Sequence, residues 1–307
     1  MYCAWVATRR VGCAVVQITP QSHRAPESGQ VGDERVRASA NTCSSCIIQR
    51  RSPSVRHAHF RTKNLYCTCR PKKGSDLTVK KEQAAAILGT YDWNFQDAEN
   101  ALAPMGVKLC FVRSPPELQR LLDSRLEIDF AFAPHWRYLI EARFLCAWPV
   151  VGFHLGRLPD DRGGSPIQHQ ILRGAYATQL CAFRIDEGID TGPVYFREDF
   201  DLSEGSLEYI LRQASSASAR IMVKIMSGNL APTPQDRTGT IWQRRGPSES
   251  RIPDGLGARS LYDFIRMLDC PGYPHAFSEV GGVKVNFSSA SLDGDEVTAN
   301  AMFHVCP

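Results

Sequence analysis

A chain of 307 residues, of which 43% are hydrophobic, can form one large domain with a smaller one and a substantial core. No run approaches the roughly 20 apolar residues that span a bilayer, so the sequence predicts no membrane partner. The net charge of +4 hides a split, because residues 1–83 carry 15 Lys and Arg against 5 Asp and Glu, and the remainder carries 21 against 27. That acidic remainder argues against a nucleic-acid surface.

The first 83 residues mix Arg, Ser and Cys without helical or strand periodicity, which predicts a disordered extension or one foreign to the rest of the fold. An organelle transit peptide and a shifted reading frame are the alternatives. Cys43-x-x-Cys46 invites a zinc interpretation, but Cys67-x-Cys69 is a poor second knuckle. Because the 11 cysteines are scattered and odd in number, reduced thiols and a cytoplasmic location are the simpler interpretation.

Strands alternate with helices after residue 83, which predicts an α/β fold with a doubly wound, mostly parallel sheet. The expected strands are 84–88, 108–112, 128–133, 150–153 and 178–185, and the expected helices are 93–102, 115–125, 139–144 and 168–173. Gly163-Gly164 lies in a loop, not between the first strand and its helix, so we expect no nicotinamide cofactor.

The later part of the chain predicts a large domain over 84–230 and a small α+β C-terminal unit over 236–307. Its expected elements are a strand ending at 199–202, a long helix to Ser227, a Pro-containing linker at 229–235, a helix at 260–268 and a hairpin of 276–280 with 283–287.

Two chemically active side chains follow apolar strands. The strand at 150–153 leads into His154, and the strand at 178–185 leads into a tight acidic turn that contains Asp190. Ligands of open α/β sheets bind where strands end, so we expect both side chains in one crevice. Catalysis by the imidazole and the carboxylate is one interpretation. A structural His154 bonded to backbone, and an Asp190 that only caps its turn, are the alternatives.

The order of several short motifs resembles a known family. These motifs are His154, Leu158-Pro159, Arg162-Gly163, Pro166 and Asp190-Thr191-Gly192. Together they are similar to the catalytic core of the folate-dependent formyltransferases, which include methionyl-tRNA formyltransferase and the sugar N-formyltransferases. The resemblance extends more weakly over 87–277, and the segments 153–168 and 262–277 are most similar to the branch that formylates amino sugars.

The resemblance implies transfer of a formyl group from formyl-tetrahydrofolate to the amine of an amino sugar, expected to be nucleotide-linked. It implies that His154 stabilises the developing oxyanion and that Asp190 orients His154 and accepts protons. The family has Asn two residues before the His, where this chain has Gly152, which offers no side-chain donor. Loss of such a donor costs about 3 kcal/mol. His135 is the expected substitute, with a packing corner at His135-Trp136 as the alternative.

The resemblance also implies two sets of binding residues. The expected cofactor-binding residues are Pro134, His135, Trp136, Leu158, Ile185, Asp186 and Glu187. The expected substrate-binding residues are Arg162, Gly163, Pro166, Gln168, Arg244, Arg245 and Tyr273. Arg162 has an equal alternative, in which its guanidinium ties the loop to Asp160 and Asp161.

The expected partner is a small-molecule substrate, with no nucleic acid, no membrane and no metal, and a homodimer is left open. A rival within the family is formylation of another amine, such as that of methionyl-tRNA. A rival from another class is a binding protein on a decayed formyltransferase scaffold, which Gly152 favours.

Overall fold

The computed structural model describes residues 82–236 and 239–305, so the Cys and His pattern before residue 82 lies outside the described residues. The described residues belong to one compact unit. The division into 84–230 and 236–307 therefore stays a prediction. In the part of the chain that the structure describes, no helix has both the length and the apolar character that crossing a bilayer requires.

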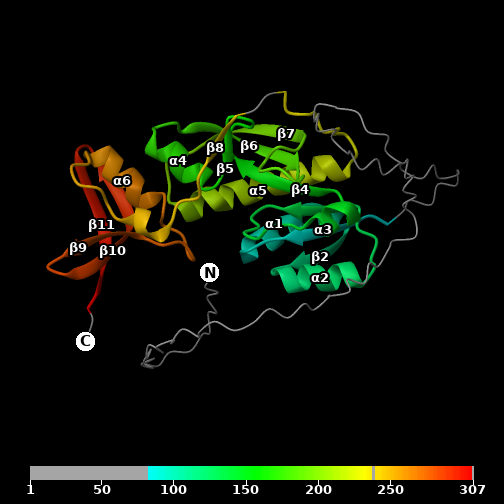
Figure 1. Ribbon diagram of the computed structural model, residues 1–307, viewed down its shortest axis with the longest axis horizontal. Coiled ribbons are helices and arrows are strands. Elements are labelled where there is room, and N and C mark those ends of the chain that lie inside the picture. The colour runs from blue at the N-terminus through cyan, green and yellow to red at the C-terminus, as the bar shows by residue number, and fades with distance from the viewer. Residues whose placement is uncertain (1–81, 237–238, 306–307) are drawn as a thin grey trace, which may run out of the picture. The chain divides into compact units, whose positions relative to one another are not determined.

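A six-stranded sheet lies at the centre, with the strand order β2-β1-β3-β4-β6-β7 (Figure 1). The strands are β1 (Ala84–Leu88), β2 (Lys108–Val112), β3 (Phe130–Ala133), β4 (Val150–Leu155), β6 (Ala177–Arg184) and β7 (Val194–Asp201). The first four pair in parallel, and β6 and β7 add antiparallel strands at one edge. The predicted doubly wound, mostly parallel α/β sheet is confirmed.

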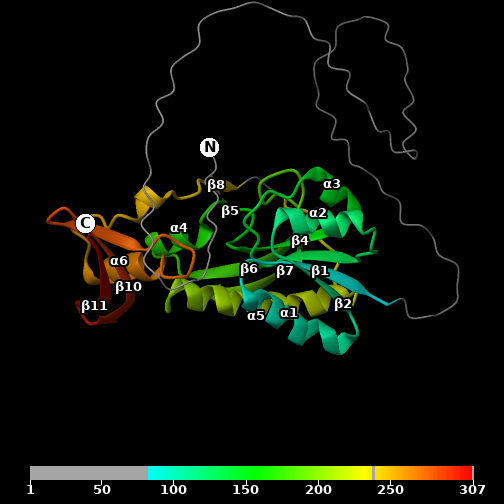
Figure 2. The same cartoon turned by 90° about the horizontal axis from the view of Figure 1, so that it is seen from below.

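Helices cover both faces of this sheet, as Figure 2 shows. They are α1 (Asp92–Leu102), α2 (Pro115–Asp123), α3 (Ala142–Ala147), α4 (Pro166–Leu172) and α5 (Leu207–Met226), with a 3-10 turn η1 (Ala103–Met105) after α1. Ala85 and Ile87 of β1 pack in the core that contains α1 and α5. The alternate residues, Ala84, Ala86 and Leu88, pack with α2 and α3. Burial on both faces explains why β1 reads as a continuous apolar run.

The structure differs from the predicted elements around the site. The helix expected at 139–144 begins at Ala142, and β4 extends through Leu155, so that His154 lies within the strand, opposite Cys181 of β6. The expected loop before Pro166 contains β5 (Asp161–Gly163), which pairs in parallel with β8 (Thr240–Trp242). These features depend on partners distant in sequence, and local patterns do not reveal them.

The C-terminal elements are a 3-10 turn η2 (Pro247–Ser250), α6 (Ala258–Arg266) and a three-stranded antiparallel sheet in the order β11-β10-β9. The predicted hairpin is confirmed as β9 (Ala276–Val280) and β10 (Val283–Asp293). The third strand, β11 (Glu296–His304), was not predicted, because most of its residues are exposed and carry no clear apolar alternation.

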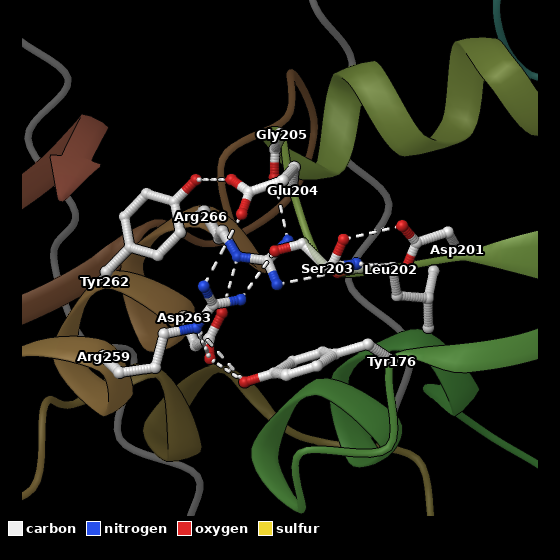
Figure 3. Close-up of polar contacts among 10 residues, drawn as sticks. All are labelled: Tyr176, Asp201, Leu202, Ser203, Glu204, Gly205, Arg259, Tyr262, Asp263 and Arg266. Atoms are coloured by element: carbon white, nitrogen blue, oxygen red, sulfur yellow. Dashed lines mark hydrogen bonds and ion pairs between the residues drawn. The ribbon is translucent and has the colours of Figure 1, made fainter.

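A buried polar network fixes α6 against the loop that follows β7 (Figure 3). The Arg266 guanidinium is 1% exposed and donates to Asp263 Oδ1 at 2.6 Å, to the Leu202 carbonyl at 2.7 Å and to the Gly205 carbonyl at 3.0 Å. Tyr176 donates to Asp263 Oδ2 at 2.5 Å. We call Arg266, Asp263, Tyr176 and Arg259 the α6 network. It anchors the end of the segment that carries Arg244 and Arg245.

Candidate active site

The structure brings His154 and Asp190 together. His154 comes from β4, and Asp190 from the turn between β6 and β7. The distance from His154 Nδ1 to Asp190 Oδ2 is 3.5 Å. His154 is 7% exposed, and the Asp190 side chain is 22% exposed. The expected convergence of the imidazole and the carboxylate is therefore observed, and their catalytic roles remain a prediction.

Strand β5 orients both side chains. His154 Nε2 lies 2.5 Å from the Asp161 carbonyl oxygen, which can only accept, so Nε2 carries the proton in the neutral ring. The Gly163 amide donates to Asp190 Oδ2 at 2.9 Å. His154 Nδ1 therefore faces a carboxylate whose position the backbone of β5 also holds. A proton taken up from a ligand can be shared between Nδ1 and Oδ2.

Two cavities meet at His154. One has a volume of about 530 Å³, and we call it the acidic cavity, because Glu141, Asp186, Glu187 and Asp190 line it and none of the described lining residues is Lys or Arg. The other has a volume of about 460 Å³. We call it the basic cavity, because Arg137, Arg244 and Arg245 line it without any Asp or Glu among its described lining residues. The residues that line both are Pro134, His135, Trp136, Phe153, His154 and Gly163.

Most of the expected cofactor-binding residues lie in one place. The acidic cavity is lined by Pro134, His135, Trp136, Ile185, Asp186 and Glu187. Leu158 lines neither cavity. Its side chain is 5% exposed and packs with Cys181, Phe183 and Val194. The expected contact between Leu158 and a cofactor stays a prediction, and in this structure the apolar side chain is part of a core cluster.

The expected substrate-binding residues gather around the basic cavity, with one exception. Its lining includes Gly163, Pro166, Gln168, Arg244, Arg245 and Tyr273. Arg162 lines neither cavity. It is 6% exposed and donates to Gln235 Oε1 at 2.6 Å. The substrate-binding role of Arg162 stays a prediction, and in this structure its buried guanidinium ties the β5 loop to the segment that carries Gln235.

The position of the family's Asn is filled. A Cβ placed on Gly152 would lie 2.8 Å from Phe183 Cε1 and 3.1 Å from Ile185 Cγ1. Contacts of this length are too close for real Cβ atoms, so Phe183 would have to move before any larger residue could fit. Gly152 therefore lacks the side-chain donor of the family's Asn, and the Phe183 side chain occupies the space that an Asn side chain would need.

His135 has the properties of a neutral hydrogen-bond donor. Burial, assisted by the Arg137 and Arg244 charges, lowers the pKa of His135 to about 4. Its Nε2 atom is buried without a hydrogen-bond partner among the described residues. Because His135 lines both cavities beside His154, a neutral ring at pH 7 can offer an N–H to a charge that develops there. Its catalytic role stays a prediction.

Two residues of the site were not predicted from the sequence. Arg137 lines the basic cavity, donates to the Tyr91 hydroxyl at 2.6 Å and lies 5.1 Å from the centre of the Tyr273 ring. Its place just after the tip of β3 was the signal that could have revealed it. Gln235 contacts the turn that holds Asp190, and its position in a Pro-containing linker gave no signal.

His154 of β4 lines both cavities, and Asp190 of the turn after β6 lies beside it, so a site for two small molecules would place both next to this pair. Within residues 82–236 and 239–305, no group of three or more His, Cys, Asp or Glu is arranged to hold a metal ion.

Comparisons with known proteins agree on one family. The model of the methionyl-tRNA formyltransferase C-terminal domain matches residues 247–304. The methionyl-tRNA formyltransferase of Rickettsia massiliae is 32% identical over 154 residues, which cover 48% of this chain and 49% of that protein. The chain thus spans about half the length of the curated relatives it matches.

Among solved structures, the methionyl-tRNA formyltransferase from Clostridium thermocellum is 31% identical with a TM-score of 0.67, covering 72% of this chain and 99% of that one. A sugar N-formyltransferase from a Shewanella species is 13% identical with a TM-score of 0.55, covering 69% and 99%, and it shares the fold alone. The chain belongs to the formyltransferase family, whose members are transferases.

Proposed function

We propose that this chain transfers a formyl group from formyl-tetrahydrofolate to a primary amine. The observation that carries the proposal is the His154–Asp190 pair at the junction of two cavities, in a chain that belongs to the formyltransferase family. Each cavity falls within the roughly 300–1,000 Å³ that small-molecule sites occupy. A donor in one cavity and an acceptor in the other would meet beside His154.

The acidic cavity suits the folate donor. A pterin ring presents N–H and NH₂ groups, which carboxylates and backbone carbonyls accept. Asp186 and Glu187 stand in the turn that lines this cavity, and Trp136 offers an aromatic face. This assignment agrees with the resemblance, which places the pterin against the same turn.

The reaction then follows from the shared residues. The amine nitrogen attacks the formyl carbon, so that a C–N bond forms and the carbonyl oxygen becomes an oxyanion. Neutral His135 offers its N–H to that charge, because the N–H of neutral His154 is already bonded to the Asp161 carbonyl. Collapse of the intermediate breaks the bond between the formyl carbon and the folate nitrogen. The proton lost by the amine is held between His154 Nδ1 and Asp190 Oδ2, and a proton returns to the folate nitrogen directly or through water.

Methionyl-tRNA is the first candidate for the acceptor. The support is the match of the methionyl-tRNA formyltransferase C-terminal domain model and relatives of that name that are 28–32% identical. Arg137, Arg244 and Arg245 would place positive charge beside the phosphates of an RNA end.

An amino-sugar nucleotide, the acceptor that the sequence favoured, is the second candidate. Residues 247–304 carry only 4 Lys and Arg against 8 Asp and Glu. Two of those four, Arg259 and Arg266, are already paired with Asp263. A surface of this composition is poorly suited to an RNA backbone, whereas the basic cavity alone can hold a diphosphate.

The test is a formylation assay with the 307-residue chain, formyl-tetrahydrofolate and two sets of acceptors, methionyl-tRNA and amino-sugar nucleotides. We expect release of tetrahydrofolate that requires an acceptor and that His154→Ala abolishes. Transfer to sugar nucleotides alone would select the second candidate. Tight folate binding without transfer to any amine would overturn the proposal that the chain is an enzyme and would favour a binding protein.

A further inference from the structure

Asp190 has an unusual backbone. Its φ is +51°, in the left-handed region that residues other than glycine rarely adopt. Such a conformation persists only where the surroundings hold it in place. The turn must therefore be held by contacts from outside itself if the Asp190 carboxylate is to stay near His154.

Gln235 makes those contacts. Its Nε2 donates to the Asp190 carbonyl at 2.9 Å and to the Gly192 carbonyl at 2.8 Å, so one amide group holds the backbone on both sides of the turn. An NH₂ group has two hydrogens, and these two bonds use both.

The same amide group is held from its other end. Arg162, in the middle of β5, donates to Gln235 Oε1 at 2.6 Å. On either side of Arg162, the Asp161 carbonyl contacts His154 and the Gly163 amide contacts Asp190. Three consecutive residues of β5 therefore hold the imidazole, the carboxylate and, through Gln235, the backbone of that carboxylate.

The segment that carries Gln235 is itself anchored. Thr233, two residues before Gln235, bridges to Val194 at the start of β7. Gln235 thus lies close to a fixed point of the backbone. Its amide group can transmit that fixed position to the turn.

We propose that Gln235 is a positioning residue, which holds the Asp190 turn in its left-handed conformation and so sets the geometry of the His154–Asp190 pair. This inference rests on the proposed formyl transfer, and Gln235 itself touches neither substrate. Gln235 lines neither cavity, and its removal lets the carboxylate move away from the imidazole.

The experiment compares Gln235→Ala and Gln235→Glu with the full-length wild-type chain. The Glu side chain keeps an oxygen for Arg162 but has no N–H for the two turn carbonyls. We expect both variants to lower kcat by about 10- to 100-fold, as a displacement of about 1 Å can do. We expect the KM of donor and of acceptor to stay within about twofold. Gln243→Ala is the matched control, an exposed glutamine on the same segment that lines neither cavity, and it should keep wild-type kcat.

Several results would overturn the proposal. Wild-type kcat in Gln235→Glu would show that only the bond to Arg162 matters. A rise in KM without a fall in kcat would assign Gln235 to binding. Unfolding of both variants at the assay temperature would show that Gln235 holds the fold rather than the pair.

A second measurement keeps the inference separate from the proposed function. The chain has 8 histidines, so the His154 imidazole signals can be assigned in NMR spectra with a His154→Asn variant. We expect Gln235→Glu, but not Gln243→Ala, to shift the His154 resonances. This readout needs no turnover. A wild-type chain without transferase activity would defeat the proposed function, whereas unchanged His154 signals in Gln235→Glu would defeat the positioning role.

Discussion

The molecule contains two buried polar clusters of opposite character, the α6 network and the His154–Asp190 pair. In the α6 network the Arg266 guanidinium makes three bonds of 2.6–3.0 Å, and each oxygen of Asp263 has a donor (Figure 3). In the pair, Nδ1 and Oδ2 are 3.5 Å apart, and Asp190 has a left-handed backbone. In the α6 network, the Arg266 guanidinium and both Asp263 oxygens have close hydrogen-bond partners. In the pair, the two side chains are further apart and the Asp190 backbone is strained.

The difference separates stability from chemistry. A buried charge that lacks partners is costly, so a saturated cluster such as the α6 network protects the fold when intact and harms it when broken. A site that must accept and release protons cannot be saturated in this way, and it keeps its geometry through backbone contacts from β5 and Gln235. Substitutions in the two clusters should therefore have different consequences.

The largest effect is expected at the pair. His154→Ala and Asp190→Asn should each lower kcat/KM for formyl transfer by about 1,000-fold, because the pair that takes up the amine proton is lost. The melting temperature should change little, since neither side chain is part of the apolar core. The measurement is tetrahydrofolate release alongside thermal unfolding. A melting temperature lowered as far as that of an α6 network variant would erase the distinction between the clusters.

The opposite behaviour is expected of Arg266→Met. The free energy of unfolding should fall by about 3–5 kcal/mol, because Asp263 keeps a buried charge after losing its main partner. Urea unfolding measures the loss, and the kcat per folded molecule should remain that of the wild type. Arg220→Met is the matched control. Its ion pair with Glu198 is exposed, so about 1 kcal/mol or less should be lost. Equal losses in the two variants would contradict the comparison.

A smaller effect concerns Gly152, beside the pair. Gly152→Asn should destabilise the chain by about 1–3 kcal/mol, because its Cβ would press on Phe183. In a Phe183→Ala background the same substitution should cost little, since the obstructing ring is gone. Urea unfolding of the wild type, the two single variants and the double variant gives the coupling free energy between residues 152 and 183. The same cost in both backgrounds would show that Phe183 does not fill the position.

Local patterns predicted much of this fold but little of what holds the site together. β1 and β2 lie at the predicted residues, because each is a compact and mostly apolar run; β1 is buried throughout, and β2 forms an edge of the sheet. The meeting of His154 and Asp190 was expected from the rule that ligands bind where strands end. In the structure β6 is antiparallel to β4 and ends beside Val151, so the turn that carries Asp190 must reach back to His154. The pairing of β5 with β8 and the contacts of Gln235 join residues far apart in sequence, and no local period marks them. The bond from Arg162 to Gln235 was not predicted for the same reason, since Gln235 lies in a linker.

The smallest effect at neutral pH belongs to His135, which stands between the cavities. Its pKa is lowered from 6.5 to about 4 in the folded chain, chiefly by burial and then by the charges of Arg137 and Arg244. Between these two values the unfolded chain binds a proton that the folded chain does not, so stability rises with pH across this range. The stability is fully present above pH 6.5 and is lost as the pH falls to about 4. The slope is at most about 1.4 kcal/mol per pH unit. Urea unfolding from pH 4 to 7 should show a steeper pH dependence in the wild type than in His135→Gln. Parallel curves would mean that His135 is solvated and charged below pH 6, which would remove the neutral donor from the proposed oxyanion site.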